Sequence, residues 1–370
     1  MLPPTLRILV AGAGIAGLAT ARALRLCGYR PDVVEELPAT TVPAAGILLL
    51  GNAARALRHL GLDDPVRPLG AVIDRQRFLD EDGAELCEVD LGRLWAGVGD
   101  CRALPRADLQ QVLLTSVGGG VRYETAVRRL ELAEPDGPVI AGFGDGATAA
   151  YDLVVGADGR GSSVRSLAAL GGPPRPVGRV VYRSVVGGGP PIDECVALLG
   201  RRAAFVVMPM GSGRLYLCAD EAATTKPVDP RARLDEVFGE FGGPTRAVLD
   251  AVETVQVAIG DEVELGCWSR GPVVLVGDAA HATSPTLAEG AAMALEDAVM
   301  LAASLQAAGS TAEALRGYES RRRPRTKWVL DRTRDRDRTR DVPPALRDPL
   351  LRVRGGRIFR DHYRLLVDPA

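Results

Sequence analysis

The glycine motif near the start of the chain constrains its fold more than any other segment. An apolar run at residues 8–11 ends at Gly12, and Gly14 and Gly17 follow it. Apolar residues then recur at helical spacing as far as residue 26, which predicts a strand, a tight turn and a helix. In such a unit Gly12 permits the turn, Gly14 lets the backbone approach a pyrophosphate, and Gly17 lets the helix pack on the strand. The free N–H groups at the helix start then face the anion.

An acid follows at the distance at which such a unit contacts a ribose. Residues 32–34 predict a second short strand, and Glu35 comes next, 18 residues after Gly17. A carboxylate there accepts hydrogen bonds from the ribose diol of a dinucleotide. The alternative interpretation is a glycine-rich turn that holds no ligand. A second match to the glycine pattern, at residues 142–147, is followed by a strand instead of a helix, so we discard it.

Composition narrows the classes of protein to which the chain can belong. It has 370 residues, and 46% hydrophobic with 25% charged residues is ordinary for a globular protein. The net charge of −2 gives no reason to expect a nucleic-acid partner. The six cysteines form no C-x-x-C pair and have no histidine at ligand spacing, so we expect no metal. No apolar run approaches the roughly 18 residues that cross a bilayer, and the first strand leaves no room for a signal peptide. We therefore expect a cytoplasmic protein without a membrane partner.

Two further strands end in polar loops. Residues 152–156 lead to Asp158 and residues 273–276 lead to Asp278, while a long apolar helix begins near Gly290. The carboxyl ends of parallel strands meet along one edge of a sheet, and ligands bind at that edge. We therefore expect these two loops to lie close to the glycine motif.

The middle of the chain predicts a different kind of sheet. Residues 172–267 alternate short strands with proline and glycine clusters, and one amphipathic helix is expected at about 232–249. Residues 71–91 predict a hairpin outside the nucleotide-binding sheet. These segments predict a separate, mostly antiparallel sheet that covers the nucleotide domain. In the tail, residues 320–341 place Arg and Asp three apart, the spacing of solvated ion pairs on a helix.

Together, the three loop motifs resemble the group A FAD-dependent monooxygenases, the p-hydroxybenzoate hydroxylase-like family, over about the whole chain. The resemblance implies an α/β fold with a Rossmann-like FAD-binding domain of the GR2 type. It also implies an inserted, mostly antiparallel β-sheet domain for the substrate, followed by C-terminal helices. The implied boundaries are residues 1–70, 101–171 and 268–320 for the FAD-binding domain, 71–100 and 172–267 for the substrate domain, and 321–370 for the helical segment.

The resemblance further implies which residues contact FAD. Arg106 would bind near its phosphates, Asp278 would bind its ribityl or pyrophosphate region, and Asp158 would serve both FAD and the nicotinamide coenzyme. The helix that begins near Gly290 would direct its N-terminus at the anionic reduced flavin. The implied cofactor-binding residues are Gly12, Gly14, Ile15, Ala16, Gly17, Glu35, Glu36, Gly46, Ile47, Leu48, Arg106, Asp158, Gly277, Asp278, Pro285, Glu289, Gly290, Ala291 and Ala292.

Two of these positions depart from the family's pattern. Glu36 stands where the family commonly has arginine, and Glu289 stands where it often has glutamine. A carboxylate at Glu289 opposes negative charge on the reduced flavin unless it points away or is protonated.

The implied reaction is a monooxygenation. The enzyme would use FAD and NAD(P)H to insert one oxygen atom of O₂, through a C4a-hydroperoxyflavin, into an electron-rich aromatic or polycyclic small molecule. The sequence has no second dinucleotide motif, as in enzymes that bind NAD(P)H transiently in a groove. A reductase, oxidase or halogenase of the same fold is one alternative, and an FAD-binding accessory protein without turnover is another. The protein would act as a monomer or a homodimer.

The substrate side offers candidates only. Tyr182 and Arg183 lie on one predicted strand of the covering sheet, and Met208 and Pro209 lie on another. Arg183 is suited to holding a carboxylate or a phenolate, or it faces solvent as an ordinary strand residue. His281 follows the third motif, where a lone histidine more often satisfies a structural hydrogen bond than acts as a base.

Overall fold

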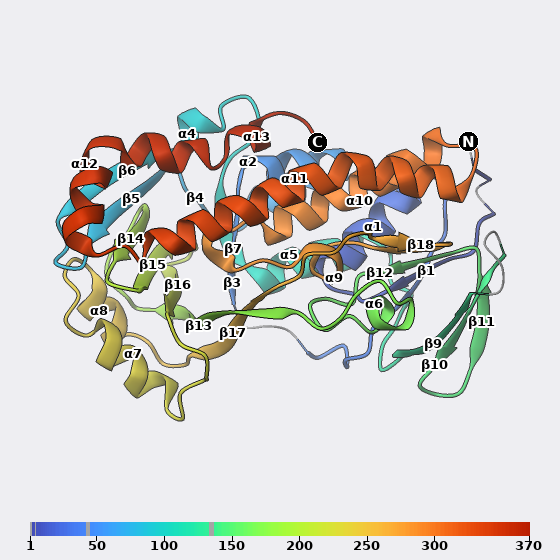
Figure 1. The fold of residues 1–370 in the computed structure, drawn as a ribbon, viewed down its shortest axis with the longest axis horizontal. Helices are drawn as coiled ribbons and strands as arrows, with labels where there is room; N and C mark the ends of the chain where they lie inside the picture. The colour runs from blue at the N-terminus through green and yellow to red at the C-terminus, as the bar shows by residue number, and fades with distance from the viewer. Residues whose placement is uncertain (1, 4, 42–44, 133–136) are drawn as a thin grey trace.

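The computed structural model describes residues 2–3, 5–41, 45–132 and 137–370, which form four β-sheets and the helices around them (Figure 1). The six-stranded sheet has the order β18 (Ser269–Arg270), β19 (Val273–Leu275), β12 (Leu153–Gly156), β1 (Ile8–Ala11), β2 (Asp32–Val34) and β8 (Val121–Arg122). The seven-stranded sheet has the order β17 (Gln256–Glu262), β13 (Arg175–Gly187), β16 (Arg214–Glu221), β15 (Ala203–Pro209), β14 (Cys195–Leu199), β5 (Arg75–Asp80) and β6 (Glu85–Asp90). Two three-stranded sheets have the orders β11 (Thr148–Tyr151), β10 (Val139–Phe143), β9 (Val127–Leu132) and β3 (Gly46–Leu49), β7 (Arg102–Pro105), β4 (Ala71–Val72).

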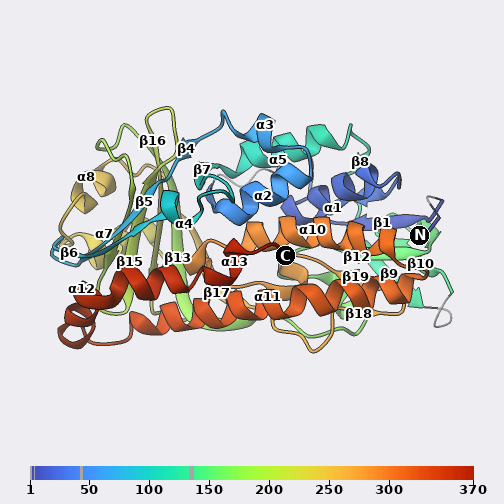
Figure 2. The ribbon, with the colours of Figure 1, turned by 90° about the horizontal axis from the view of Figure 1, so that it is seen from above.

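Most helices among the described residues are short, and the three longest are α10, α11 and α12. The helices are α1 (Ile15–Leu26), α2 (Gly51–His59), α3 (Asp63–Val66), α4 (Leu91–Leu94), α5 (Arg106–Ser116), α6 (Ser163–Leu167), α7 (Pro230–Phe238), α8 (Thr245–Asp250), α9 (Asp278–His281), the 3₁₀ turn η1 (Pro285–Leu287), α10 (Gly290–Ala307), α11 (Thr311–Thr339), α12 (Pro344–Asp361) and α13 (Arg364–Val367). Helices α10 and α11 lie side by side, and α11 extends from the six-stranded sheet to the seven-stranded one (Figure 2).

The predicted strand, turn and helix at the start of the chain are confirmed. Strand β1 pairs in parallel with β12 on one side and β2 on the other, and its four residues are buried. At Gly17 a Cβ atom would lie 1.8 Å from the carbonyl oxygen of Gly12, so only glycine lets α1 approach the turn this closely. Gly12 itself has φ +108°, which favours glycine.

The covering sheet is mostly antiparallel, as predicted, and one helix prediction is wrong. Strands β5 and β6 of the predicted hairpin join this sheet, with β5 parallel to β14 and the other pairs antiparallel. The single helix expected at 232–249 is two helices, α7 and α8. Gly239, Gly242 and Gly243 lie between them, and Pro244 is the N-cap of α8. Glycine and proline weaken a helix interior, and here they outweigh the apolar periodicity.

A buried ionic cluster joins α10 to α11. Arg322 is completely buried, and its Nε and Nη1 donate to Asp297 Oδ1 at 2.8 Å and to Glu296 Oε2 at 2.6 Å. Arg325 donates to both oxygens of Glu296, at 2.7 and 2.8 Å. Burial alone would raise the pKa of Glu296 and of Asp297, but the nearby positive charges hold both below their ordinary values. The cluster therefore consists of ionised groups that depend on one another.

The prediction of a solvated tail helix is correct for only part of α11. The pairs at spacing three do form, with Arg338 reaching Asp335 and Arg340 reaching Asp337. However, four of the arginines are buried in the body of the protein, namely Arg322, Arg325, Arg336 and Arg340. The spacing of charges along a helix does not reveal which face another element covers. Among the described residues, no helix is long and apolar enough to span a membrane.

Removing Arg322 tests the ionic cluster. Arg322→Met removes a buried arginine from two buried carboxylates, of which Glu296 keeps Arg325 and Asp297 keeps His281, so we expect a loss of roughly 3–5 kcal/mol in the free energy of unfolding. Urea denaturation followed by circular dichroism measures it. Arg338→Met, on the same helix but with a side chain 73% exposed, serves as the control and should change stability by less than about 0.5 kcal/mol. Equal losses in the two variants would contradict a special role for the cluster.

Candidate active site

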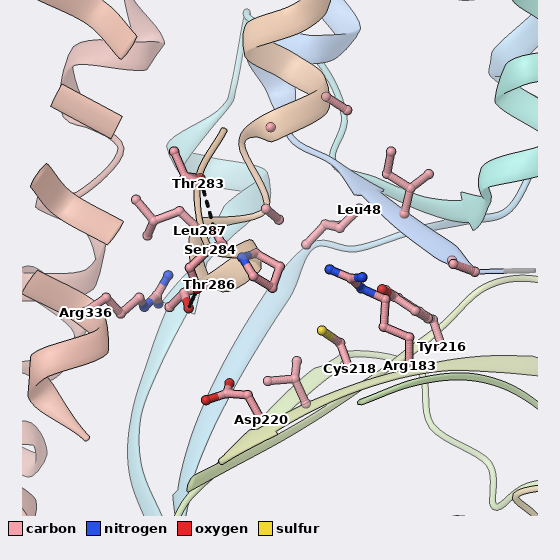
Figure 3. A pocket seen from close by; sticks show the side chains of 18 of the residues that line it. Leu48, Arg183, Tyr216, Cys218, Asp220, Thr283, Ser284, Thr286, Leu287 and Arg336 are labelled. Carbon is pink, nitrogen blue, oxygen red and sulfur yellow. Dashed lines mark hydrogen bonds between the residues drawn. The ribbon is translucent and has the colours of Figure 1, made fainter. Parts of the chain in front are cut away.

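One pocket collects the loops that follow β1, β12 and β19. Its other walls are β3, the start of α10, the inner face of the seven-stranded sheet, and residues of α11 and the C-terminal segment (Figure 3). The sequence-predicted cofactor residues that line it are Gly14, Ile15, Ala16, Gly46, Ile47, Leu48, Arg106, Asp278, Pro285, Gly290 and Ala291. The predicted cofactor residues that do not line it are Gly12, Gly17, Glu35, Glu36, Asp158, Gly277, Glu289 and Ala292.

Two helices present their N-termini to this pocket. Helix α1 begins after Gly14 and α10 begins at Gly290, and no side chain caps either helix. Neither has an acidic residue in its first turn. A Cβ on Gly14 would meet nothing within 4 Å, so the backbone is open on the pocket side. Uncapped N–H groups and the two helix dipoles together favour a ligand with negative charge.

The side chain of Asp297 holds the loop after β19 in place. The N–H of Gly277 donates to Asp297 Oδ2 at 2.8 Å, and His281 Nε2 lies 2.6 Å from the same oxygen. Gly277 has φ +59°, and a Cβ there would lie 2.7 Å from that of Ala16, so glycine is required. His281 stacks on Trp268 away from the pocket. The structure therefore gives His281 a structural hydrogen bond and does not bring it to the site.

The aspartate in the loop after β12 accepts hydrogen bonds from its own loop and from the start of the next helix. Asp158 accepts hydrogen bonds from Ser162 Oγ at 2.5 Å and from the N–H of Val164 at 2.9 Å, at the start of α6. Ala157, Gly159 and Arg160 of this loop line the pocket, and Arg160 is not among the residues predicted from the motifs. Its Nε donates to Asp278 Oδ2 at 3.1 Å and its Nη2 donates to the carbonyl oxygen of Thr283 at 2.8 Å. Arg160 thus ties the second loop to the third.

Arg106 is placed at the pocket by strand pairing. Its N–H donates to the carbonyl oxygen of Ala45 at 2.8 Å, next to the pairing of β3 with β7. Burial lowers the pKa of the guanidinium, and the nearby Asp278 offsets part of that effect. Its Nε is buried and has no hydrogen-bond partner among the described residues. A buried donor without a partner is costly, so this group is suited to an incoming acceptor.

The two glutamates that follow β2 point in different directions. Glu35 Oε2 accepts from the N–H of Ala13 at 2.7 Å, within the glycine turn. Its other oxygen accepts from the N–H of Leu37 at 3.0 Å. Glu36 is exposed and pairs with Arg128 at 2.8 Å. Glu35 is therefore beside the turn as predicted, while the structure turns Glu36 toward solvent.

Glu289 lies just before α10 and turns away from the pocket. Its Oε2 accepts from Asn52 Nδ2 at 2.8 Å, and its Oε1 has no hydrogen-bond partner within the described ranges of the chain. Burial raises the pKa of Glu289 to about 8, and the nearby Glu296 carboxylate adds to the shift. A carboxylate at this position would oppose the negative charge of a reduced flavin unless it pointed away or was protonated. The carboxyl of Glu289 does point away, and with this pKa it is protonated at neutral pH.

On the sheet side, alternation along the strands separates the candidates. Arg183 and Met208 line the pocket, whereas Tyr182 faces the opposite core and donates to Glu221 Oε1 at 2.6 Å. Successive strand residues point to opposite faces, so Tyr182 and Arg183 cannot share a site. Pro209 is not part of the lining. Figure 3 shows Arg183 beside Tyr216 and Cys218. These two residues lie on β16, and Asp220 lies further along β16.

Helix α11 adds two arginines that the sequence analysis missed. Arg336 and Arg340 both line the pocket, although each is about 95% buried. Arg340 donates to Thr286 Oγ1 at 2.7 Å and pairs with Asp220 and Asp337. In the sequence these residues are part of a run of alternating charges, which contains no signal that distinguishes them from their exposed neighbours.

Glu289→Gln tests the protonation of the buried carboxyl. Below about pH 4.5 the carboxyl of wild type is protonated in both states, so the two proteins should be equally stable. Between 4.5 and 8 only the unfolded state ionises, so wild type should lose about 1.4 kcal/mol per pH unit relative to the variant. The difference should level off above pH 8. Urea denaturation across this range measures it, with Glu36→Gln as the exposed control. Parallel curves for wild type and Glu289→Gln would contradict the assignment.

Comparisons with known proteins agree with this geometry. The family described as FAD binding domain matches residues 5–333. The chain is 32% identical to the FAD-dependent urate hydroxylase of Klebsiella pneumoniae subsp. pneumoniae, covering 90% of this chain and 89% of the relative. It is 33% identical to 3-amino-4-hydroxybenzoate 2-monooxygenase PtnB3 of Streptomyces platensis, covering 93% and 91%.

A solved structure gives the same result for the fold. The crystal structure of Klebsiella pneumoniae HpxO complexed with FAD and uric acid matches with a TM-score of 0.85 and 27% identity, covering 98% of this chain and 95% of that one. The match includes both the nucleotide-binding loops and the covering sheet, since it extends over nearly the whole chain. The protein therefore belongs to the FAD-binding family of group A flavoprotein monooxygenases.

Proposed function

We propose that this protein is an FAD-dependent, NAD(P)H-using hydroxylase of a small, planar aromatic or heteroaromatic substrate that carries negative charge. One observation supports it most strongly: the nucleotide-binding loops and the inner face of the seven-stranded sheet open into a single pocket. That pocket contains more positive than negative side chains. Its charged residues are Arg106, Arg160, Arg183, Arg336 and Arg340 against Asp220 and Asp278.

The residues present fit FAD. The open backbone at Gly14 and the uncapped start of α1 suit a pyrophosphate, and Arg106 supplies a buried guanidinium with an unused donor. Strand β3 and the start of α10 would hold the flavin ring between them. When bound, FAD supplies the redox chemistry by which one oxygen atom of O₂ reaches the substrate. The proposal also includes the domain boundaries that the family resemblance implies.

The remaining wall of the pocket would bind the substrate. Arg183 and Met208 come from the covering sheet, with apolar side chains such as Leu199 and Val206 beside them. A guanidinium binds a phenolate or carboxylate oxygen through charge-assisted hydrogen bonds, and it stabilises negative charge on an electron-rich ring. The apolar walls would exclude water from the reacting ring. The relatives act on urate and on an aminohydroxybenzoate, both planar rings with polar substituents.

Turnover assays test the reaction class. We expect the purified protein to be yellow and to oxidise NADH or NADPH faster in the presence of at least one member of a panel of urate, hydroxybenzoates, phenols and indoles. Mass spectrometry should find a product with one added oxygen atom. An oxidase would instead release H₂O₂ without altering the aromatic compound, and an accessory protein would show no flavin reduction. Either result would overturn the proposal.

Arg106→Gln tests the cofactor site. Loss of a buried, charge-assisted donor should weaken FAD binding by roughly ten-fold to a hundred-fold. Titration of the apoprotein with FAD, followed by flavin fluorescence, measures the dissociation constant. Arg128→Gln removes the same charge from the exposed pair with Glu36 and should leave FAD affinity unchanged. Unchanged affinity in Arg106→Gln would remove Arg106 from the proposed site.

A further inference from the structure

Arg336 of α11 has an unusual environment at the edge of the pocket. Its guanidinium lies over three aromatic rings, 5.1 Å from the centre of Phe78, 4.6 Å from that of Phe359 and 5.8 Å from that of Tyr363. All three rings also line the pocket. The rings hold the planar group in place by cation–π contacts and restrict its movement. This arrangement is a cation fixed in an aromatic cage.

The positive charge of Arg336 has no acidic partner in the part of the chain that the structure describes. Its Nη1 donates to the neutral hydroxyl of Tyr363 at 2.8 Å, and its Nη2 is buried and finds no hydrogen-bond partner among those residues. Among the described residues, no carboxylate lies within ion-pair distance of Arg336, although the side chain is only 5% exposed. A buried, unpaired charge costs several kcal/mol, so an arrangement like this is favourable mainly when a ligand supplies the opposite charge.

The ion pairs in the pocket show which of its arginines have a carboxylate partner and which have none among the described residues. Arg160 is paired with Asp278, and Arg340 is paired with Asp220. The guanidinium groups of Arg106, Arg183 and Arg336 have no carboxylate partner among the described residues. Arg106 lies near the nucleotide-binding loops, where Asp278 favours its charged form, and Arg183 of the covering sheet is close enough to oppose it. Arg183 and Arg336 are therefore available to the substrate.

The two available arginines lie on opposite sides of the pocket. Figure 3 shows Arg183 extending from the covering sheet on one side and Arg336 extending from α11 on the other, with Thr286 and Leu287 beside Arg336. We propose that Arg336 is a specificity-determining residue that binds a carboxylate or second oxyanion of the substrate, whose other polar end faces Arg183. The inference rests on the proposed function. It predicts that aromatic hydroxy acids bind in preference to simple phenols.

The competing explanation is that Arg336 only packs the C-terminal segment against β5. That role would depend on the cation–π contacts and on the hydrogen bond to Tyr363, and it would not depend on the charge of a ligand. Arg332, one turn earlier on α11, offers a matched comparison. Its guanidinium lies 5.0 Å from the centre of the Trp328 ring and it is not part of the pocket. A variant at Arg332 therefore removes a cation–π contact from the same helix without changing the lining of the pocket.

The test measures binding of charged and neutral pairs of ligands to the FAD-loaded protein. The probes are hydroxybenzoates, each paired with the corresponding hydroxybenzamide, and calorimetry or flavin difference spectra give the dissociation constants. We expect wild type to bind at least one acid about ten-fold more tightly than its amide. Arg336→Met should lose that preference through weaker binding of the acid. Arg336→Lys should retain part of it, and Arg332→Met should behave like wild type.

Several outcomes would overturn the inference. They are an unchanged preference in Arg336→Met, an equal loss in Arg332→Met, and a wild-type protein that binds no acid more tightly than its amide. Thermal unfolding of each variant without ligand separates misfolding from lost binding, and the acid should raise the melting temperature of wild type but not of Arg336→Met. Failure of the proposed function looks different: acids bind with the expected preference, but none of them accelerates NAD(P)H oxidation or is hydroxylated.

Discussion

The buried carboxylate of Asp297 is the interaction on which the rest of the site depends. It accepts from the N–H of Gly277 in the loop after β19, lies against His281, and receives Nε of Arg322 from α11. One residue thereby fixes a pocket loop, a long helix that begins at the pocket, and the helix that covers both. Because Asp297 is completely buried, its charge is tolerated only while these partners stay in place. Local structure at the pocket and global stability are thus coupled through one carboxylate.

The same principle of charge balance organises the pocket itself. Some arginines are neutralised within the protein, and these tie loops and sheets together, as Arg160 does with Asp278. Others are left without a partner and face the cavity, and these define what the cavity can accept. Arginine suits both roles because its charge survives burial and its planar fork directs several donors at once. The distribution of acids among the arginines therefore separates structural cations from ligand-binding ones.

The nucleotide-binding half could be predicted from sequence in some detail. Gly12 and Gly17 are required by backbone geometry, which leaves a clear local pattern, and strands β1 and β12 beside them are apolar because both faces of the sheet are covered. The covering sheet was predictable as a sheet, but not in the order of its strands. The expected helix at 232–249 failed because apolar periodicity continued across a glycine-rich break. The sequence also did not show on which face of the sheet each side chain lies. It therefore did not distinguish Tyr182 from Arg183 as a pocket residue.

By itself, the sequence determined that the chain has a dinucleotide-binding unit, an apolar core of parallel strands and a second sheet, because each depends on residues close together in the chain. Only the tertiary structure decided which charges are buried. Glu289 turns away from the pocket toward Asn52, His281 is held by Asp297, and Arg336 lies in an aromatic cage built from β5 and the C-terminal segment. These outcomes depend on contacts between residues that are 16 to 258 positions apart in the chain. Burial, which sets the energy of a charge, is a property of the whole fold and not of any local pattern.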